Sequence, residues 1–196
     1  MERFEVETLY KDNKYLNFME ATCPNGKKWV YVKRVNTKGV VIIVPLIMDL
    51  KEPSTLFLKT KRPPLIAENI SEYNLEFPAG LVGDENKEES FEEAISKELL
   101  EETGMKAESF DIKIKNLSSS AGCVSEVSTL AIAKITNSQI HQKPVSDGGI
   151  IQERIIIPAS EIKNFLKDCQ NNKISIGAQT LAGLYYLTED LLLSQF

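Results

Sequence analysis

The chain of 196 residues is poor in the side chains that build zinc sites, disulfide frameworks and catalytic triads. Its single histidine, His141, lies in a polar stretch, where we expect an ordinary loop residue, so histidine-based acid–base or triad chemistry is disfavoured. The three cysteines, Cys23, Cys123 and Cys169, are odd in number and far apart in the sequence. This pattern is typical of reduced thiols rather than of a disulfide framework or a zinc knot.

Long apolar runs and basic blocks are also absent from the sequence. No run approaches the roughly 18 apolar residues of a membrane span, so we expect no span. The first 15 residues are rich in charge, so we expect no secretory signal and a cytoplasmic protein. A net charge of −5 without a basic block gives no footprint for nucleic acid. Small phosphorylated molecules stay compatible, because a bound cation and a few local lysines and arginines can reverse the field of a site.

What the sequence does contain is a glutamate-rich segment with clear helix limits, from Phe91 to Met105. Ser90 and Glu93 have the spacing of a capping box, which predicts where the helix begins. Gly104 is typical of the left-handed residue that follows a helix, which predicts where it ends.

Three glutamates of this helix lie on or beside the stripe that ought to be apolar. At about 100° per residue, Glu98 and Glu102 project within the inward face and Glu101 lies at its margin. The apolar members of that face are Phe91, Ala94, Ile95 and Leu99. Carboxylates gathered on a semi-buried surface must take up protons or share a cation. Oxygen ligands without a neighbouring cysteine or histidine favour Mg²⁺ or Mn²⁺ over zinc. The spacing alone leaves a solvated glutamate-rich helix as an equally good interpretation.

Strand-like and helix-like segments alternate along the rest of the chain. The alternating pattern of residues 4–35, with a turn at residues 24–26, predicts two or three antiparallel strands. Further strands are expected at residues 40–48 and 55–60, which should pair, and at 74–77, 110–116, 127–135 and 154–157. Helices are expected at residues 161–169, capped by Ser160, and at 178–193. Strands interleaved with helices predict an α/β sandwich.

The order and spacing of the helix residues resemble the Nudix box, G-x5-E-x7-(R/K)-E-U-x-E-E-x-G-U, where U is a bulky apolar residue. The matching positions are Gly83, Glu89, Lys97, Glu98, Glu101, Glu102 and Gly104. Lys97 stands where the box normally has arginine, so either it orients the box or it is an exposed residue paired with Glu93 or Glu101. The stretch from Gly80 to Glu89 is about three residues longer than usual, so Gly80 rather than Gly83 can be the true equivalent of the box glycine.

Flanking segments extend the resemblance to the ADP-ribose pyrophosphatase branch of the Nudix hydrolases, over roughly residues 10–190. They are residues 61–64, 75–80, 120–126 and 177–181. The resemblance implies a Nudix-type α/β/α sandwich with a mixed sheet. It also implies that residues 1–38 form a small antiparallel β subdomain for dimerisation and nucleotide contacts, and that residues 39–196 form the catalytic domain.

The same resemblance implies a metal site and a catalytic loop. The main-chain carbonyl of Ala79 and the carboxylates of Glu98 and Glu102 would hold Mg²⁺, with Mn²⁺ as an alternative, and Glu101 would assist a second or third ion. Glu126 would act as the base or position the water from a flexible loop, so the catalytic residues would be Glu101, Glu102 and Glu126. A solvated loop carboxylate is the alternative for Glu126, and Glu89 is expected to orient the box.

For the substrate, the resemblance implies an aromatic clamp and charged contacts from the N-terminal strands. Trp29 would stack on adenine, Tyr15 would supply the second face, and Arg34 and Arg62 would bind phosphate or ribose. A core or dimer-interface aromatic is an equally weighted interpretation of Trp29. Relatives of this branch pair by exchanging the N-terminal sheet, so a homodimer is expected.

These implications lead to one expected activity and two alternatives. The expected activity is Mg²⁺-dependent hydrolysis of ADP-ribose, or a similar nucleoside diphosphate sugar, to AMP and a sugar phosphate. The branch usually has proline where this chain has Ala121, which relaxes the loop and leaves GDP-mannose, UDP-sugars and other nucleoside diphosphate derivatives open. The alternative from another class is a Nudix domain that senses ADP-ribose without cutting it.

Overall fold

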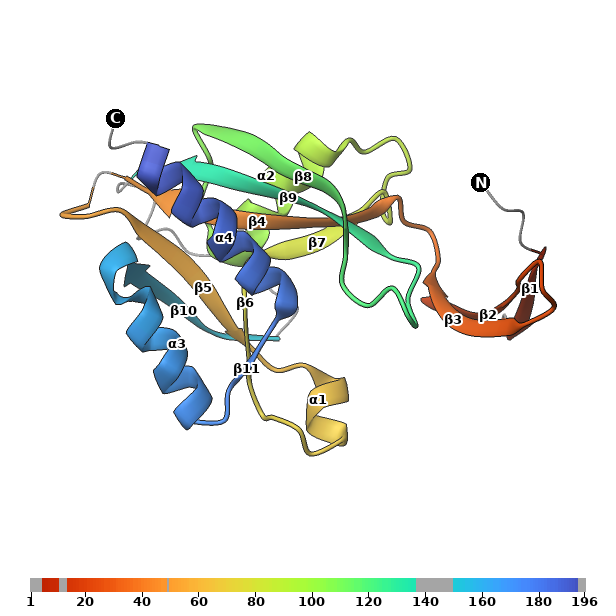
Figure 1. Ribbon diagram of the computed structural model, residues 1–196. Coiled ribbons are helices and arrows are strands. Elements are labelled where there is room, and N and C mark those ends of the chain that lie inside the picture. The colour runs from red at the N-terminus through yellow and green to blue at the C-terminus, as the bar shows by residue number, and fades with distance from the viewer. Residues whose placement is uncertain (1–4, 11–13, 49, 137–149, 194–196) are drawn as a thin grey trace.

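The computed structural model describes residues 5–10, 14–48, 50–136 and 150–193 (Figure 1). His141 lies outside the described residues, so its place in a loop stays a prediction. Within the described ranges, none of the helices combines the length and the apolar character that crossing a membrane would need. Cys23, Cys123 and Cys169 are all free thiols.

The N-terminal part forms a three-stranded antiparallel sheet, as the alternating pattern predicted. Its strands are β1 (Glu5–Tyr10), β2 (Leu16–Thr22) and β3 (Lys28–Arg34). The β2–β3 turn ends at Gly26, whose φ of 81° suits a residue without a Cβ. In Figure 1 this sheet projects from the rest of the molecule. The two sheets are separate, while the division into domains at residues 38 and 39 stays a prediction.

A second, eight-stranded mixed sheet forms the centre of the molecule. Its path runs β11-β6-β5-β4-β9-β8, with β10 paired to β5 and β7 paired to β4. The β4–β9 and β11–β6 pairs are parallel and the other pairs are antiparallel, including the predicted β4–β5 pair. The bounds are β4 Gly39–Ile47, β5 Ser54–Thr60, β6 Asn74–Glu76, β7 Ala79–Val82, β8 Ser109–Ser118, β9 Val127–Ile135, β10 Ile151–Pro158 and β11 Ser175–Ile176.

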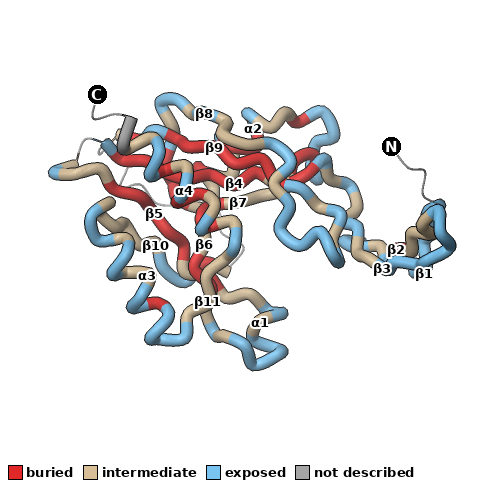
Figure 2. Tube along the Cα trace, viewed as in Figure 1, coloured by how far each residue is buried: buried red, intermediate tan, exposed pale blue. Residues whose placement is uncertain are grey.

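Helices cover both faces of this sheet, because its central strands are apolar on both sides. On β4, Val41 and Ile43 pack with helix α2 (Phe91–Thr103), whereas Ile42 and Val44 pack with α3 (Ile162–Asn171) and α4 (Ala178–Leu193). Successive strand side chains point to opposite faces, so one strand serves two cores. Figure 2 shows the buried residues concentrated along the central strands. The α/β/α sandwich is confirmed.

Two local expectations differ from the structure. Between β5 and β6, where no helix was expected, the chain forms the short helix α1 (Pro63–Ala67), because proline is well suited to the first position of a helix. Ser160 was expected to cap the next helix, and this prediction is wrong. The helix begins at Ile162, and the Ser160 hydroxyl instead donates to Glu52 Oε1 at 2.9 Å.

Candidate active site

Helix α2 has the limits and the orientation that the sequence predicted. Ser90 Oγ accepts a hydrogen bond from the Glu93 N–H at 3.1 Å, and Glu93 Oε2 accepts from the Ser90 N–H at 2.8 Å. At the other end Gly104 has a φ of 76°. Arg154 of β10, which the sequence did not single out, donates from Nε to the Glu102 carbonyl at 2.6 Å and so holds the last turn. These contacts fix which side of α2 faces the sheet.

Glu98 and Glu102 lie against two consecutive residues of β7. A Cβ on Gly80 would lie 1.9 Å from the Glu98 carboxyl carbon, so Glu98 can keep this position only above a residue without a Cβ. Glu102 Oε2 accepts a hydrogen bond from the Ala79 N–H at 3.0 Å. Gly80 is therefore the glycine that Glu98 requires, whereas Gly83 has a φ of 81° and begins the longer loop.

Burial raises the pKa of both carboxyl groups to about 7. For Glu98 the loss of hydration is the largest cause, opposed by Lys97 and reinforced by Glu101. For Glu102 it is again the largest cause, opposed by the Ala79 N–H and reinforced by Glu98. Semi-buried carboxylates that repel one another become stable when they share a cation.

The donor set fits a hard divalent cation. Glu98, Glu102 and the main chain of Ala79 offer oxygen atoms only, which suit Mg²⁺ or Mn²⁺. Among the described residues, however, no three histidine, cysteine, aspartate or glutamate side chains already converge as a ligand cluster. The structure therefore does not bring Glu101 together with Glu98 and Glu102 as a three-carboxylate group, and its part in the metal site stays a prediction.

The raised pKa values predict a pH-dependent stability for the metal-free protein. Between about pH 4.5 and pH 7 the folded protein binds more protons than the unfolded chain, so these groups lower the free energy of unfolding as the pH rises. We expect Glu102→Gln to raise Tm relative to the wild type by several degrees at pH 8 in EDTA and by much less at pH 5, since one pKa unit is about 1.4 kcal/mol. Thermal melts at the two pH values measure this difference, and an equal difference at both would contradict the burial of Glu102.

Lys97 lies beside the acidic cluster, with partners that differ from the expected ones. Its Nζ lies 3.0 Å from Glu85 Oε2, 3.8 Å from Glu89 Oε1 and 3.9 Å from Glu98 Oε1. Among the described residues, neither Glu93 nor Glu101 forms an ion pair with it. Glu85 belongs to the longer loop. The Lys97–Glu85 ion pair therefore joins the two departures from the box, the longer loop and the lysine.

Glu89, which was expected to orient the box, lies at the entry into α2. It is buried, and its Oε2 accepts a hydrogen bond from the Gly83 N–H at 2.8 Å. Lys38 also donates from Nζ to the Glu89 carbonyl at 3.0 Å. These bonds tie the end of the extended loop to the end of β7, which fixes the entry into α2.

A cleft of about 430 Å³ opens where β7, the loop before β9 and the start of α4 meet. Four residues predicted for the site lie together in it: Arg34, Arg62, Ala79 and Glu126. The sequence reasoning missed four polar side chains of the same cleft: Asn74, Glu76, Gln179 and Thr180. Glu76, Gln179 and Thr180 lie in flanking segments of the resemblance, which is a signal that could have found them, whereas Asn74 lies just before one of these segments.

Glu76 holds Arg62 in the cleft. Arg62 makes a forked contact with this carboxylate, Nη2 to Oε1 at 2.6 Å and Nε to Oε2 at 3.2 Å. Asn74 Nδ2 donates to the same Oε2 at 2.7 Å. A forked arginine–carboxylate pair fixes the plane of the guanidinium group, so Arg62 is pre-oriented to meet an anionic ligand.

Glu126 is paired with Arg34. Its Oε2 lies 2.5 Å from Arg34 Nε, and both side chains line the cleft. The Glu126 carboxylate is therefore a paired, partly buried group, while its role as a base or in positioning water stays a prediction.

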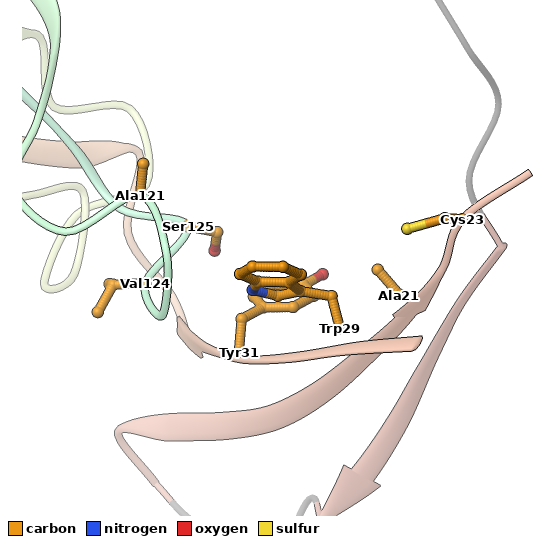
Figure 3. Close-up of a pocket in the computed structure, with 7 residues that line it drawn as sticks. All are labelled: Ala21, Cys23, Trp29, Tyr31, Ala121, Val124 and Ser125. Carbon is orange, nitrogen blue, oxygen red and sulfur yellow. The ribbon is translucent and has the colours of Figure 1, made fainter. Parts of the chain in front are cut away.

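Trp29 lies outside this cleft, in a separate pocket of about 360 Å³ between β3 and the loop before β9 (Figure 3). Tyr31 of β3 and Ala121, Val124 and Ser125 of the loop line the same pocket. Because Ser125 lines the pocket and the next residue, Glu126, lines the cleft, the two hollows lie side by side along the loop. Tyr15 lines neither, and its place in an aromatic clamp stays a prediction.

Comparison with known family models gave no match, and neither did comparison with curated proteins. Solved structures do match. The crystal structure of an ADP compounds hydrolase has 21% identity and a TM-score of 0.68, over 99% of this chain and 95% of that chain. The NUDIX domain of Shewanella oneidensis NrtR, complexed with ADP-ribose, has 15% identity and a TM-score of 0.56, over 78% of this chain and 86% of that chain.

A third solved structure, a binary complex of a C. elegans Ap4A hydrolase, has 14% identity and a TM-score of 0.50, over 80% of this chain and 99% of that chain. The three matched proteins share the sandwich described above, and here the glutamates of the box line up on α2 against β7. The protein has the Nudix fold.

Proposed function

We propose that the protein hydrolyses the diphosphate bond of ADP-ribose, or of a similar nucleoside diphosphate sugar, to AMP and a sugar phosphate, with Mg²⁺ or Mn²⁺ as cofactor. One observation carries the proposal. Two carboxylates with pKa values of about 7, Glu98 and Glu102, lie against Ala79 and Gly80, and these two β7 residues line the cleft that also presents Arg34, Arg62 and Glu126. Acidic ligands beside cationic side chains suit a diphosphate that is bound together with a divalent cation.

The residues divide the work of the reaction between them. A divalent cation at Glu98 and Glu102 would neutralise the diphosphate oxygens and lower the pKa of the attacking water. Arg62 is oriented by Glu76 to hold a phosphate oxygen. Glu126 would accept the proton as water attacks one phosphorus and the bridging P–O bond breaks, and the neighbouring Arg34 keeps this carboxylate in place.

The pocket beside the cleft suits the base of the nucleotide. Trp29 is 56% exposed and presents its ring beside Tyr31, with an apolar wall from Ala121 and Val124. An aromatic plane at an open pocket binds a purine by stacking. A substrate with its base here would direct its diphosphate along the loop toward Arg34 and Glu126.

A substrate panel tests the proposal. Wild-type protein with Mg²⁺ is incubated with ADP-ribose, GDP-mannose, a UDP-sugar and a dinucleoside polyphosphate, and the products are separated by ion-exchange chromatography. We expect AMP and ribose phosphate from ADP-ribose, and no product in EDTA. Absence of cleavage for the whole panel would contradict the proposed hydrolysis.

The sensor alternative is favoured by one comparison, since the NrtR domain was solved with ADP-ribose bound. If ADP-ribose raised Tm without being cleaved, this second function would hold. The full set of box glutamates favours the enzyme, because a pure sensor has no need of paired carboxylates at the diphosphate.

We also propose that the chain forms a homodimer through its N-terminal sheet. Paired residues of an antiparallel sheet share a face, which places Tyr10, Phe18 and Val30 on the face opposite Trp29. Their exposed fractions are 57%, 45% and 41%, a large apolar surface for a small sheet.

A second copy of the chain would cover this surface. We expect Phe18→Asp to convert a dimer to a monomer in light scattering at micromolar concentration, because a buried unpaired carboxylate opposes association. A wild-type protein that is monomeric under the same conditions would contradict the dimer.

A further inference from the structure

The loop that carries Glu126 is bonded to β3 along its length. The Val32 N–H donates to the Cys123 carbonyl at 2.8 Å, and the Ser125 N–H donates to the Val32 carbonyl at 3.1 Å. Val32 and Val124 thus form a parallel β-bridge. The loop expected to be flexible is therefore joined to the edge of the N-terminal sheet by one β-bridge.

A side chain fixes each end of this segment. At one end the Trp29 indole Nε1 donates to the Gly122 carbonyl at 2.7 Å. At the other end Arg34 pairs with Glu126. The attachment points on β3 are residues 29, 32 and 34, so one short strand makes all of these bonds to the loop.

We propose that Trp29 is a positioning residue for catalysis, because its indole N–H holds the loop in the register that places Glu126 beside Arg34. The inference rests on the proposed role of Glu126. Without the indole donor the Gly122 carbonyl would turn to water, since Gly122 is exposed. The two peptide hydrogen bonds of Val32 would then fray from that end.

We call the Trp29–Gly122 hydrogen bond the latch. Its position links binding of the base to the placement of Glu126. The pocket has Trp29 and Tyr31 on one side and Ala121 and Val124 on the other, so a bound base contacts both parts that the latch joins. A planar base would exclude water from the Trp29–Gly122 hydrogen bond and thereby strengthen it. A base-containing substrate would therefore hold Glu126 in place better than a diphosphate that leaves the pocket empty.

Trp29→Phe separates the two roles of the side chain, because phenylalanine keeps an aromatic plane and lacks the N–H donor. We expect kcat for ADP-ribose to fall by about twofold to tenfold with little change in KM, as the loss of one hydrogen bond implies. Trp29→Ala should lower kcat similarly and also raise KM. A Trp29→Phe enzyme with wild-type kcat would overturn the inference.

Hydrogen exchange tests the latch without any turnover. We expect the amides of Val32 and Ser125 to exchange about twofold to tenfold faster in Trp29→Phe than in the wild type. Lys28→Gln is the matched control, because it removes the exposed Lys28–Glu20 ion pair on the other face of β3 and should leave both amides unchanged.

Hydrogen exchange and kinetics together distinguish a failure of the latch from a failure of the proposed function. Unchanged exchange in Trp29→Phe would overturn the latch, whatever the kinetics. Exchange could also be faster in Trp29→Phe while the wild-type protein cleaves no nucleoside diphosphate derivative. That result would support the structural role of the latch, but it would overturn the catalytic role together with the proposed function.

Discussion

Replacing Glu102 with glutamine is expected to lower kcat by a factor of about 10³ or more, while the fold is retained. The amide is nearly the same size and can still accept the Ala79 N–H that Glu102 Oε2 accepts at 3.0 Å. It removes the negative charge that a divalent cation requires. Steady-state kinetics with an Mg²⁺ titration measure the effect, together with a thermal melt that confirms folding.

Glu92→Gln is the matched control for this experiment. Glu92 lies on the same helix but is exposed in its first turn, so its neutralisation should leave kcat and the Mg²⁺ dependence unchanged. Comparable activity of the Glu102→Gln and wild-type enzymes would remove Glu102 from the metal site. A loss of activity in both variants would point to the net charge of α2 rather than to a ligand.

Glu126→Gln is expected to lower kcat by about 10², the range of a lost general base. The structure sharpens this prediction, because Glu126 lies in the cleft and its partner is Arg34. Glutamine keeps the size and a carbonyl acceptor for Arg34, and it loses the capacity to take a proton from water. Kinetics with ADP-ribose and Mg²⁺ measure the loss.

The KM of the Glu126→Gln variant separates chemistry from binding. If Glu126 acts on the water, KM should change little, since Arg34 and Arg62 still face the substrate. A raised KM with an unchanged kcat would assign Glu126 to substrate binding through Arg34 and would place the base elsewhere.

Local patterns of the sequence were sufficient for the elements and for one side of the site. The capping box of Ser90 and Glu93 and the left-handed Gly104 defined α2, because capping depends on residues three or four apart. The same periodicity turned Glu98 and Glu102 toward the sheet. Ser160 shows the limit, since its hydroxyl found a partner in Glu52, more than 100 residues away.

Contacts between distant segments could not be predicted from such patterns. The pairing of Lys97 with Glu85 depends on the path of the extended loop, and the forked pair of Arg62 and Glu76 depends on strand β6 lying beside β5. The hydrogen bond from Trp29 to Gly122 spans 93 positions of the chain. None of these partners is marked by spacing, composition or periodicity.

By itself the sequence determined that a capped helix presents glutamates on an inward face, and that the apolar segments such as residues 40–48 form strands. Both follow from the geometry of a single element, in which residue spacing sets direction. Only the tertiary structure decided that Glu98 sits on Gly80, that Arg34 and Arg62 share a cleft with Glu126, and that the loop is latched to β3. Those contacts join residues that are far apart along the chain. Their distance in space depends on how separate elements pack together, which residue spacing does not determine.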